Sequence, residues 1–289
     1  MTLPPAYLRN GELAGMRYTL TALDKILLGT LGSRTGSATG SSLDFSDYRE
    51  YHPGDDLRRL DWNIYARSDR LTVKLFHEEV SPHVDIIIDA SASMSIDPGA
   101  KANAAAWLSA LLWTAARNAE CTATAWSISD SIRPLGESTR RPSNWEPLTF
   151  ESGSDPLRTL SSAGNVWRHN GIRFIISDLL WQGEPPRAVR QLAAGAAQII
   201  VVQLLATDDI NPPPTGRWRL TDSENESSLD LFVDAGVQAK YRNALQSLQR
   251  QWRDGCRRHG AIFTTITAEE LLSSQRPVTL EQAGIISLG

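Results

Sequence analysis

Cysteine and histidine are scarce in this chain of 289 residues, which contains two of the former and five of the latter. Two cysteines, Cys121 and Cys256, do not make the disulfide framework of a small secreted protein. The histidines are scattered, and no two of them stand at the spacing of zinc ligands. We therefore expect ordinary thiols in a reducing compartment and no zinc chemistry.

Long apolar runs and an excess of one charge are also missing. The longest apolar run, 199–206, contains a glutamine and is too short to span a bilayer. The first fifteen residues show no basic region followed by an apolar segment, so no signal peptide is expected. A net charge of −4 gives no attraction to nucleic acid or to an anionic membrane. We expect a cytoplasmic protein that neither binds nucleic acid nor inserts into a membrane.

The most distinctive stretch is 84–94, VDIIIDASASM, in which a short apolar run leads directly to Asp89. Such a run is typical of a strand that is buried on both faces of a parallel sheet. Ser91 and Ser93 follow the aspartate at alternate positions. Open α/β sheets bind ligands beyond the carboxyl ends of their strands. Three oxygen-bearing side chains are therefore expected at a ligand-binding edge.

Strands and helices are expected to alternate over the rest of the chain. The segment 101–118 is apolar on most faces and predicts a buried helix, whereas 173–180, RFIISDLL, predicts a buried strand that ends at Asp178. Further elements are expected as strand 122–129, helix 186–198, strand 199–205, helix 235–259 and strand 261–267. This pattern predicts an α/β fold with a doubly wound, mostly parallel sheet. Asp178 would reach the crevice of Asp89 if their two strands are neighbours.

The N-terminal part of the chain has a different character. We expect a helix over 16–28, a loop rich in glycine and serine over 29–42, and a strand over 71–76. The segment 44–70, here called the polar block, mixes Arg and Asp with Tyr and Trp. This composition favours a polar interface, formed either with the main domain or with a partner. We expect Trp62 to be at least partly buried as the anchor of that interface.

Four interpretations of the Asp89 loop differ in the chemistry that they require. Mg²⁺ takes six oxygen ligands, so two serine hydroxyls together with Asp89 and Asp178 suit this ion. Because the hydroxyls are neutral, the bound Mg²⁺ could still accept a carboxylate from a partner. A phosphatase with an aspartate nucleophile needs a second acid two residues later, where this chain has Ser91. A serine nucleophile needs a base, and no histidine-bearing motif accompanies these serines. In the fourth interpretation, Asp89 and the two serines only cap the next helix, but a cap needs fewer hydroxyls than are present here.

Two motifs resemble known families. The stretch 89–93 matches the D-x-S-x-S pattern of the metal-ion-dependent adhesion site in von Willebrand factor A-type domains, and Asp178 resembles the distal aspartate of that site. The segment 48–79, YREYHPGDDLRRLDWNIYARSDRLTVKLFHEE, resembles the signature of the bacterial "domain of unknown function 58" family, in which it precedes an A-type domain. Segments 216–236 and 241–259 are also similar to the C-terminal part of that family.

The resemblance implies a Rossmann-like, von Willebrand factor A-like domain over 81–289 and an N-terminal accessory region over 1–80. It also implies one Mg²⁺ or Mn²⁺ at the carboxyl edge of the sheet. The family's site has a threonine between the two motifs, and Ser154 is expected in its place, with the hydroxyl but without the methyl that stiffens χ1. The ligands that it implies are Asp89, Ser91, Ser93, Ser154 and Asp178.

The same resemblance implies no known catalysis. It favours a protein-interaction module that works with a MoxR-type AAA+ ATPase in the chaperone-like maturation or assembly of a client protein. A partner would supply a carboxylate to the metal. Two alternatives stay open, namely a metal-dependent hydrolase of phosphoesters and a metal-independent scaffold that makes its contacts through the polar block.

Overall fold

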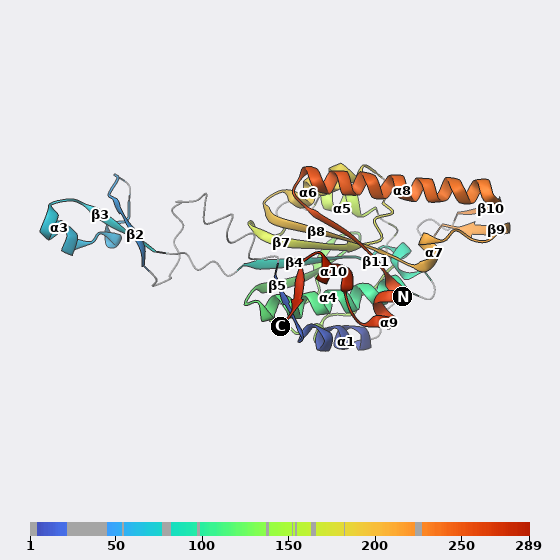
Figure 1. Ribbon diagram of the computed structural model, residues 1–289, viewed down its shortest axis with the longest axis horizontal. Coiled ribbons are helices and arrows are strands. Elements are labelled where there is room, and N and C mark those ends of the chain that lie inside the picture. Colours follow the sequence, from blue (N-terminus) through green and yellow to red (C-terminus); the bar gives the residue numbers. More distant parts are fainter. Residues whose placement is uncertain are drawn as a thin grey trace. The chain divides into compact units, whose positions relative to one another are not determined.

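Two compact units make up the protein in a computed structural model (Figure 1). The main unit comprises Met1–Leu28 and Pro82–Gly289, and the smaller unit comprises Gly29–Ser81. We expected residues 1–80 to form one accessory region, whereas the N-terminal helix packs with the main unit. The structure describes residues 5–21, 45–53, 55–76, 82–96, 99–136, 139–151, 153, 155–162, 166–181, 183–222 and 227–289.

A six-stranded sheet forms the centre of the main unit. Five of its strands are parallel, and β6 at one edge runs antiparallel to β5. The chain therefore has the α/β architecture with a mostly parallel sheet that its sequence predicts. The spatial order of the strands is β11 (Ile262–Thr267), β8 (Ala196–Leu205), β7 (Gly171–Ser177), β4 (His83–Asp89), β5 (Thr122–Ile128) and β6 (Ile132–Pro134).

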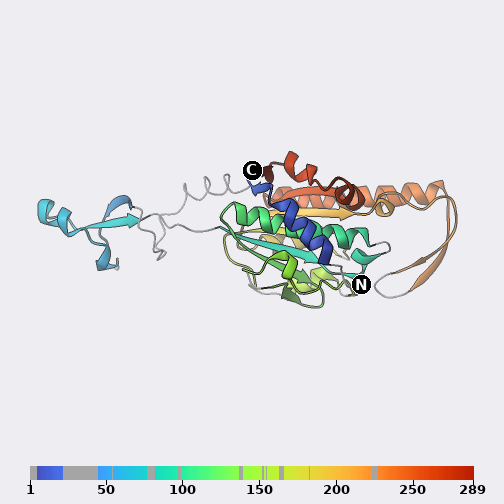
Figure 2. The same cartoon turned by 90° about the horizontal axis from the view of Figure 1, so that it is seen from below.

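Helices cover both faces of this sheet (Figures 1 and 2). Successive side chains of a strand point to opposite faces, so Ile86 and Ile88 join the core on one side and Ile87 joins the core on the other. Burial on both sides explains why β4 is a continuous apolar run. The first face carries α1 (Pro5–Gly15), α4 (Ala100–Asn118), α9 (Ala268–Ser274) and α10 (Val278–Gln282), and the second carries α5 (Pro156–Ser162), α6 (Pro185–Ala193) and α8 (Ala235–Arg258).

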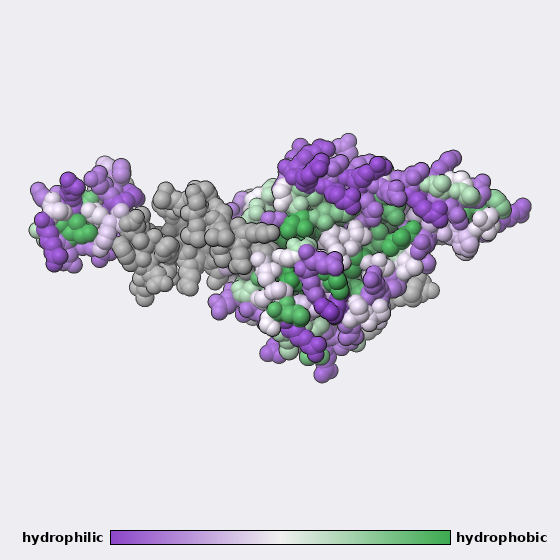
Figure 3. Space-filling model, viewed as in Figure 1, coloured by the Kyte–Doolittle hydropathy of each residue, from purple (hydrophilic) through white to green (hydrophobic). Residues whose placement is uncertain are grey.

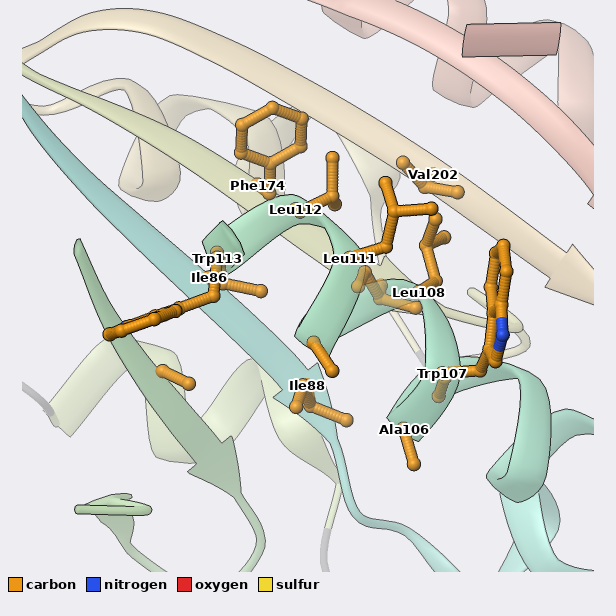
Figure 4. Close-up of a cluster of buried hydrophobic side chains, with 14 of the residues drawn as sticks. Ile86, Ile88, Ala106, Trp107, Leu108, Leu111, Leu112, Trp113, Phe174 and Val202 are labelled. Atoms are coloured by element: carbon orange, nitrogen blue, oxygen red, sulfur yellow. The ribbon is translucent and has the colours of Figure 1, made fainter. Parts of the chain in front are cut away.

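The helix α4 supplies much of the larger core. Every residue from Ala100 to Ala116 is buried, and Leu108, Leu111 and Leu112 point towards Phe174 and Val202 of the sheet (Figure 4). Burying one such side chain fully contributes roughly 1.5–3 kcal/mol. The helix is therefore fixed firmly on the sheet, and its first turn is held near the carboxyl end of β4.

The N-terminal helix α1 lies against α4 (Figure 2). Two glycines permit the contact, because a Cβ atom at Gly11 would lie 2.1 Å from the Trp107 carbonyl oxygen, and one at Gly15 would lie 2.7 Å from the Thr114 Cβ. The chain then forms β1 (Tyr18–Leu20), which pairs antiparallel with β12 (Ile286–Leu288). The helix expected over 16–28 is therefore wrong for residues 18–20, and residues 22–28 lie outside the described part.

The helix α8 follows a hairpin that stands apart from the central sheet. The hairpin pairs β9 (Gly216–Thr221) with β10 (Ser228–Val233), and the short helix α7 (Thr207–Ile210) precedes it. The outer face of α8 is hydrophilic (Figure 3), and its buried residues lie near its C-terminal end, at Trp252, Gly255 and Cys256. In the part of the chain that the structure describes, no helix is long and apolar enough to cross a membrane.

The smaller unit contains most of the polar block. It pairs β2 (Phe45–Glu50) with β3 (Thr72–Phe76) in an antiparallel ladder, as expected for the second strand, and adds the short helix α3 (Trp62–Ser68). Asp61 caps α3 by accepting from the backbone N–H groups of Asn63 and Ile64. Trp62 is 61% exposed, so the anchoring that we expected of this ring is not found within its own unit.

Candidate metal centre

The carboxyl ends of β4 and β7 lie side by side at the centre of the sheet. Ile88 pairs with Ile176 in parallel register, so the next residues, Asp89 and Ser177, stand at the same edge. The order of the strands reverses between β4 and β7, and open α/β sheets bind ligands at such switch points. The condition for Asp178 to reach the crevice of Asp89, that their strands are neighbours, is therefore met.

Asp89 is fully buried and is held by three donors. Its Oδ1 accepts from the Ser91 backbone N–H at 2.9 Å, and its Oδ2 accepts from the Ser177 hydroxyl at 2.5 Å and from the Trp181 indole N–H at 2.8 Å. Burial raises the pKa of Asp89, and the nearby charge of Asp178 adds to the increase, while the three donors oppose it. This environment would favour a cation beside the carboxylate.

Ser93 lies in a short turn, η2 (Ala92–Ser95), and Ser91 is the residue that directly precedes this turn. The hydroxyl oxygens of Ser91 and Ser93 are 3.0 Å apart. Neighbouring ligands in an octahedron with 2.0–2.1 Å bonds are about 2.9 Å apart, so this spacing suits two adjacent ligands of Mg²⁺. Within the turn, Met94 is fully buried and the Ser95 hydroxyl donates to the Phe150 carbonyl at 3.1 Å. These two contacts hold the hydroxyls in place.

Asp178 is buried, and both its carboxylate oxygens and its backbone carbonyl have partners. Its Oδ1 accepts from the Leu180 backbone N–H at 3.1 Å, and its backbone carbonyl accepts from the Gln203 amide at 3.1 Å. Its Oδ2 pairs with the Lys101 ammonium at 2.9 Å, and the same ammonium lies 3.0 Å from Asp209 Oδ2. Asp178 is therefore positioned at the site, but one of its oxygens already has a cationic partner.

Ser154, the fifth expected ligand, lies outside the described residues. Its neighbours Gly153 and Asp155 help to line an open, largely polar pocket of about 1020 Å³, and none of the other four expected ligands lines it. Within the described ranges, no group of three or more His, Cys, Asp or Glu side chains could hold a metal ion. A metal centre at Asp89 would therefore depend on the serine hydroxyls as well as the two carboxylates.

Four residues of the site were not assigned a role from the sequence. Ser177 and Trp181 flank the predicted Asp178, and their contacts with Asp89 join segments that are 88 and 92 positions apart. Lys101 was visible as the first residue of an apolar helical pattern, where a lone charge is unusual. Asp209 gave no signal, because it lies in the polar stretch between the predicted strand 199–205 and the predicted helix 235–259.

The donor set fits a small, hard divalent cation. Two carboxylates balance the charge of a dication, and two hydroxyls at octahedral spacing add neutral oxygen ligands of the kind that Mg²⁺ accepts. No histidine or cysteine is among these donors, which disfavours zinc and copper. The site is a candidate because its two carboxylates, those of Asp89 and Asp178, are both buried at one edge of the sheet.

Comparison with known proteins places the chain in a family. Residues 47–253 match the family model that is described as "Protein of unknown function DUF58", and this match spans more than half of the chain. The chain belongs to the DUF58 family. The match takes in most of the polar block, Asp89 and both serines, Asp178, and the hairpin that precedes α8. The DUF58 description itself assigns no activity.

Relatives of this DUF58 protein also lack an assigned function. Uncharacterized proteins of Mycobacterium tuberculosis (Rv1480) and Mycobacterium bovis (Mb1516) are each 24% identical over 266 residues, covering 83% of this chain and 81% of the relative. Among solved structures, BatB from Bacteroides thetaiotaomicron is 11% identical with a TM-score of 0.33, covering 71% of this chain and 98% of its own. An aerotolerance-related membrane protein from Bacteroides fragilis is 12% identical with a TM-score of 0.36, covering 70% and 99%. Scores this low support no functional argument.

Proposed function

We propose that this DUF58 protein is a non-enzymatic, Mg²⁺-dependent (or Mn²⁺-dependent) protein-interaction module with a von Willebrand factor A-like, Rossmann-like fold. One observation carries the proposal: Asp89, Ser91, Ser93 and Asp178 meet at the edge of the sheet where the strand order reverses. In this proposal these four residues and Ser154 hold the ion. A partner then supplies a carboxylate to the ion.

The contacts of the proposed ligands suit binding better than hydrolysis. Both carboxylate oxygens of Asp89 already accept hydrogen bonds, which keeps the group fixed and makes it a poor nucleophile. The hydroxyls of Ser91 and Ser93 hydrogen-bond to each other and not to a base that could activate either of them. Because the serine ligands are neutral, a bound dication would retain affinity for an anionic group from outside.

We further propose a MoxR-type AAA+ ATPase as the partner, acting with this protein in the chaperone-like maturation or assembly of a client. The support for this partner is the resemblance of the polar block and of the Asp89 motif. A cytoplasmic site of action is also part of the proposal. It is supported by Cys121 and Cys256, which are both free and buried, as is usual for structural thiols in a reducing compartment.

Titration calorimetry tests the metal site directly. The full chain is stripped with EDTA, dialysed and titrated with MgCl₂ and then with MnCl₂. We expect one ion to bind to the wild type and none to bind to Asp89→Ala. The matched control is Asp230→Ala, which removes an exposed aspartate of the hairpin and leaves binding unchanged. Absence of binding by the wild type, or equal binding by Asp89→Ala, would reject the proposal.

A metal-independent scaffold is the second candidate, and the Lys101–Asp178 ion pair favours it. The ammonium gives one buried carboxylate a counter-charge without any metal ion. In this case, pull-down of the ATPase by the full chain would survive EDTA and the Asp89→Ala change. It would fail with Arg58→Ala, because Arg58 is an exposed side chain of the polar block. Asp61 is a poorer probe, since it caps α3 and its loss would disturb the fold of the smaller unit.

A further inference from the structure

Lys101 is the only charged residue among the buried residues of α4. Its side chain is 3% exposed, and lysine is almost never buried unless it is paired. It is also the second residue of the helix, where the positive end of the helix dipole disfavours a cation. Helix stability therefore does not account for its position. The two carboxylates that it contacts, Asp178 and Asp209, do account for it.

The ammonium of Lys101 is buried and forms ion pairs with two carboxylates, those of Asp178 and Asp209. The proposed metal site therefore contains a positive charge of the protein itself. That charge lies 2.9 Å from an oxygen of Asp178, which is one of the two acidic residues proposed to hold the ion.

We propose that Lys101 is a tethered competitor of the divalent cation. Its ammonium pairs with Asp178 when no ion is bound, and it shifts to Asp209 alone when an ion binds. This inference rests on the proposed function, because it concerns the regulation of the same site. It explains how two buried carboxylates coexist without a metal. It also implies that the affinity for the metal is lower than the same ligands would give without the ammonium, so the ion dissociates more readily.

Asp209 is suited to receive the displaced ammonium. It lies in α7, where its Oδ2 accepts from the Ala206 backbone N–H at 2.8 Å, so its carboxylate is held in place independently of Lys101. Its side chain is 17% exposed, compared with 1% for Asp178, and a charge pair there is better solvated. Asp178 keeps its Oδ1 contact with the Leu180 N–H in either state, which leaves its Oδ2 free to face the ion.

The test compares Mg²⁺ affinities of full-length variants by calorimetry. Lys101→Met keeps the length of the side chain and removes its charge, and like-charge repulsion predicts that it binds Mg²⁺ about tenfold more tightly than the wild type. Asp209→Asn keeps the acceptor for the Ala206 N–H but weakens the alternative partner of Lys101. Its affinity for Mg²⁺ should therefore be lower than that of the wild type by about threefold or more. The control is Lys240→Met on the exposed face of α8, with unchanged affinity.

The double variant separates competition from a simple change of total charge. Competition predicts that Asp209→Asn has little effect when Lys101 is already Met, whereas a charge effect predicts the same loss in both backgrounds and rejects the inference. The inference is also rejected if Lys101→Met binds Mg²⁺ no more tightly than the wild type does. If the wild-type binding is lost in Asp89→Ala, that result leaves the proposed metal site unaffected. If Lys101→Met does not fold, Lys101→Gln, which also removes the charge, takes its place in both comparisons. If neither wild type nor Lys101→Met binds Mg²⁺, the proposed function itself fails.

Discussion

At the scale of single residues, a buried carboxylate is tolerated only when its oxygens have donors. Trp181 supplies one of the three donors to Asp89, through its indole N–H. Trp181→Phe keeps an aromatic ring against Trp252 but removes that donor. We expect the free energy of unfolding in EDTA to fall by about 1.5–3 kcal/mol, the usual contribution of a hydrogen bond to a charged group. Urea unfolding followed by circular dichroism measures it.

The control for this change is Trp218→Phe in the hairpin. Trp218 is 39% exposed and donates its indole N–H to the Pro214 carbonyl at the surface. Its replacement should change the free energy of unfolding by no more than about 0.5 kcal/mol, as is usual for surface sites. Equal effects of the two substitutions would contradict the role given to the Trp181 hydrogen bond.

The two thiols give a second prediction at this scale. Burial raises the pKa of Cys121 to about 11 and that of Cys256 to about 12. Because the thiolate is the reactive form, neither residue should react with Ellman's reagent at pH 8 while the protein is folded. Both should react in guanidinium chloride. A thiol that reacts rapidly in the native protein would show that its burial is incomplete.

Sequence could identify only some of the residues of the site. Asp89 and Asp178 each end an apolar run, and this local pattern suffices to place them at the ends of buried strands. Lys101 contacts Asp178 across 77 positions of sequence, and the hydroxyl of Ser177 contacts Asp89 across 88. Such contacts are set by which strands are neighbours in space. They are invisible in any local pattern.

At the scale of elements, the contact between α1 and α4 depends on glycine. Gly11→Ala would improve the intrinsic helix propensity of α1 by about 1 kcal/mol. However, the new Cβ would lie 2.1 Å from the Trp107 carbonyl oxygen, which is backbone and cannot move freely. Overpacking of this kind costs about 1–3 kcal/mol or more. We therefore expect a net loss of stability, visible as a lower Tm in differential scanning calorimetry.

Gly255→Ala in α8 is the matched control for this steric argument. Gly255 is also a buried glycine within a helix, but a Cβ there would meet its nearest atom, in Pro186, at 3.4 Å, an ordinary contact distance. Only the gain in helix propensity then applies, so the Tm should stay the same or rise. A fall in Tm as large as that of Gly11→Ala would mean that the distance to the facing backbone does not decide the outcome.

The long, periodic elements could be predicted from the sequence, whereas the N-terminal helix α1 could not. The helix expected over 101–118 is found at Ala100–Asn118, and the strand expected over 199–205 lies within Ala196–Leu205. The helix α1 escaped prediction because its two glycines reduce local helix propensity. Packing on α4 compensates for them. Its partner elements lie far along the chain, so local sequence carries no sign of that compensation.

At the scale of the whole molecule, the alternation of elements predicts the α/β class but not the order of the strands. That order places β7 beside β4 and so creates the candidate site from segments almost ninety positions apart. It also joins β1 to β12 at opposite ends of the chain. An ion held between the ends of β4 and β7 would therefore link distant parts of the main unit, and its binding should stabilise the fold as a whole.

This linkage gives the last prediction, which concerns the Tm of the intact protein. A ligand at 100 times its dissociation constant stabilises the native state by about 2.7 kcal/mol if it does not bind the unfolded chain. In a unit of this size, each kcal/mol raises the Tm by about 2–4 °C. Saturating Mg²⁺ should thus raise the Tm of the wild type by about 5–10 °C relative to EDTA. Asp89→Ala should show no such shift, whereas Asp230→Ala should match the wild type. A wild-type Tm that is the same in Mg²⁺ and EDTA would contradict an ion between the two strands, since an ion that binds only the folded chain must raise it.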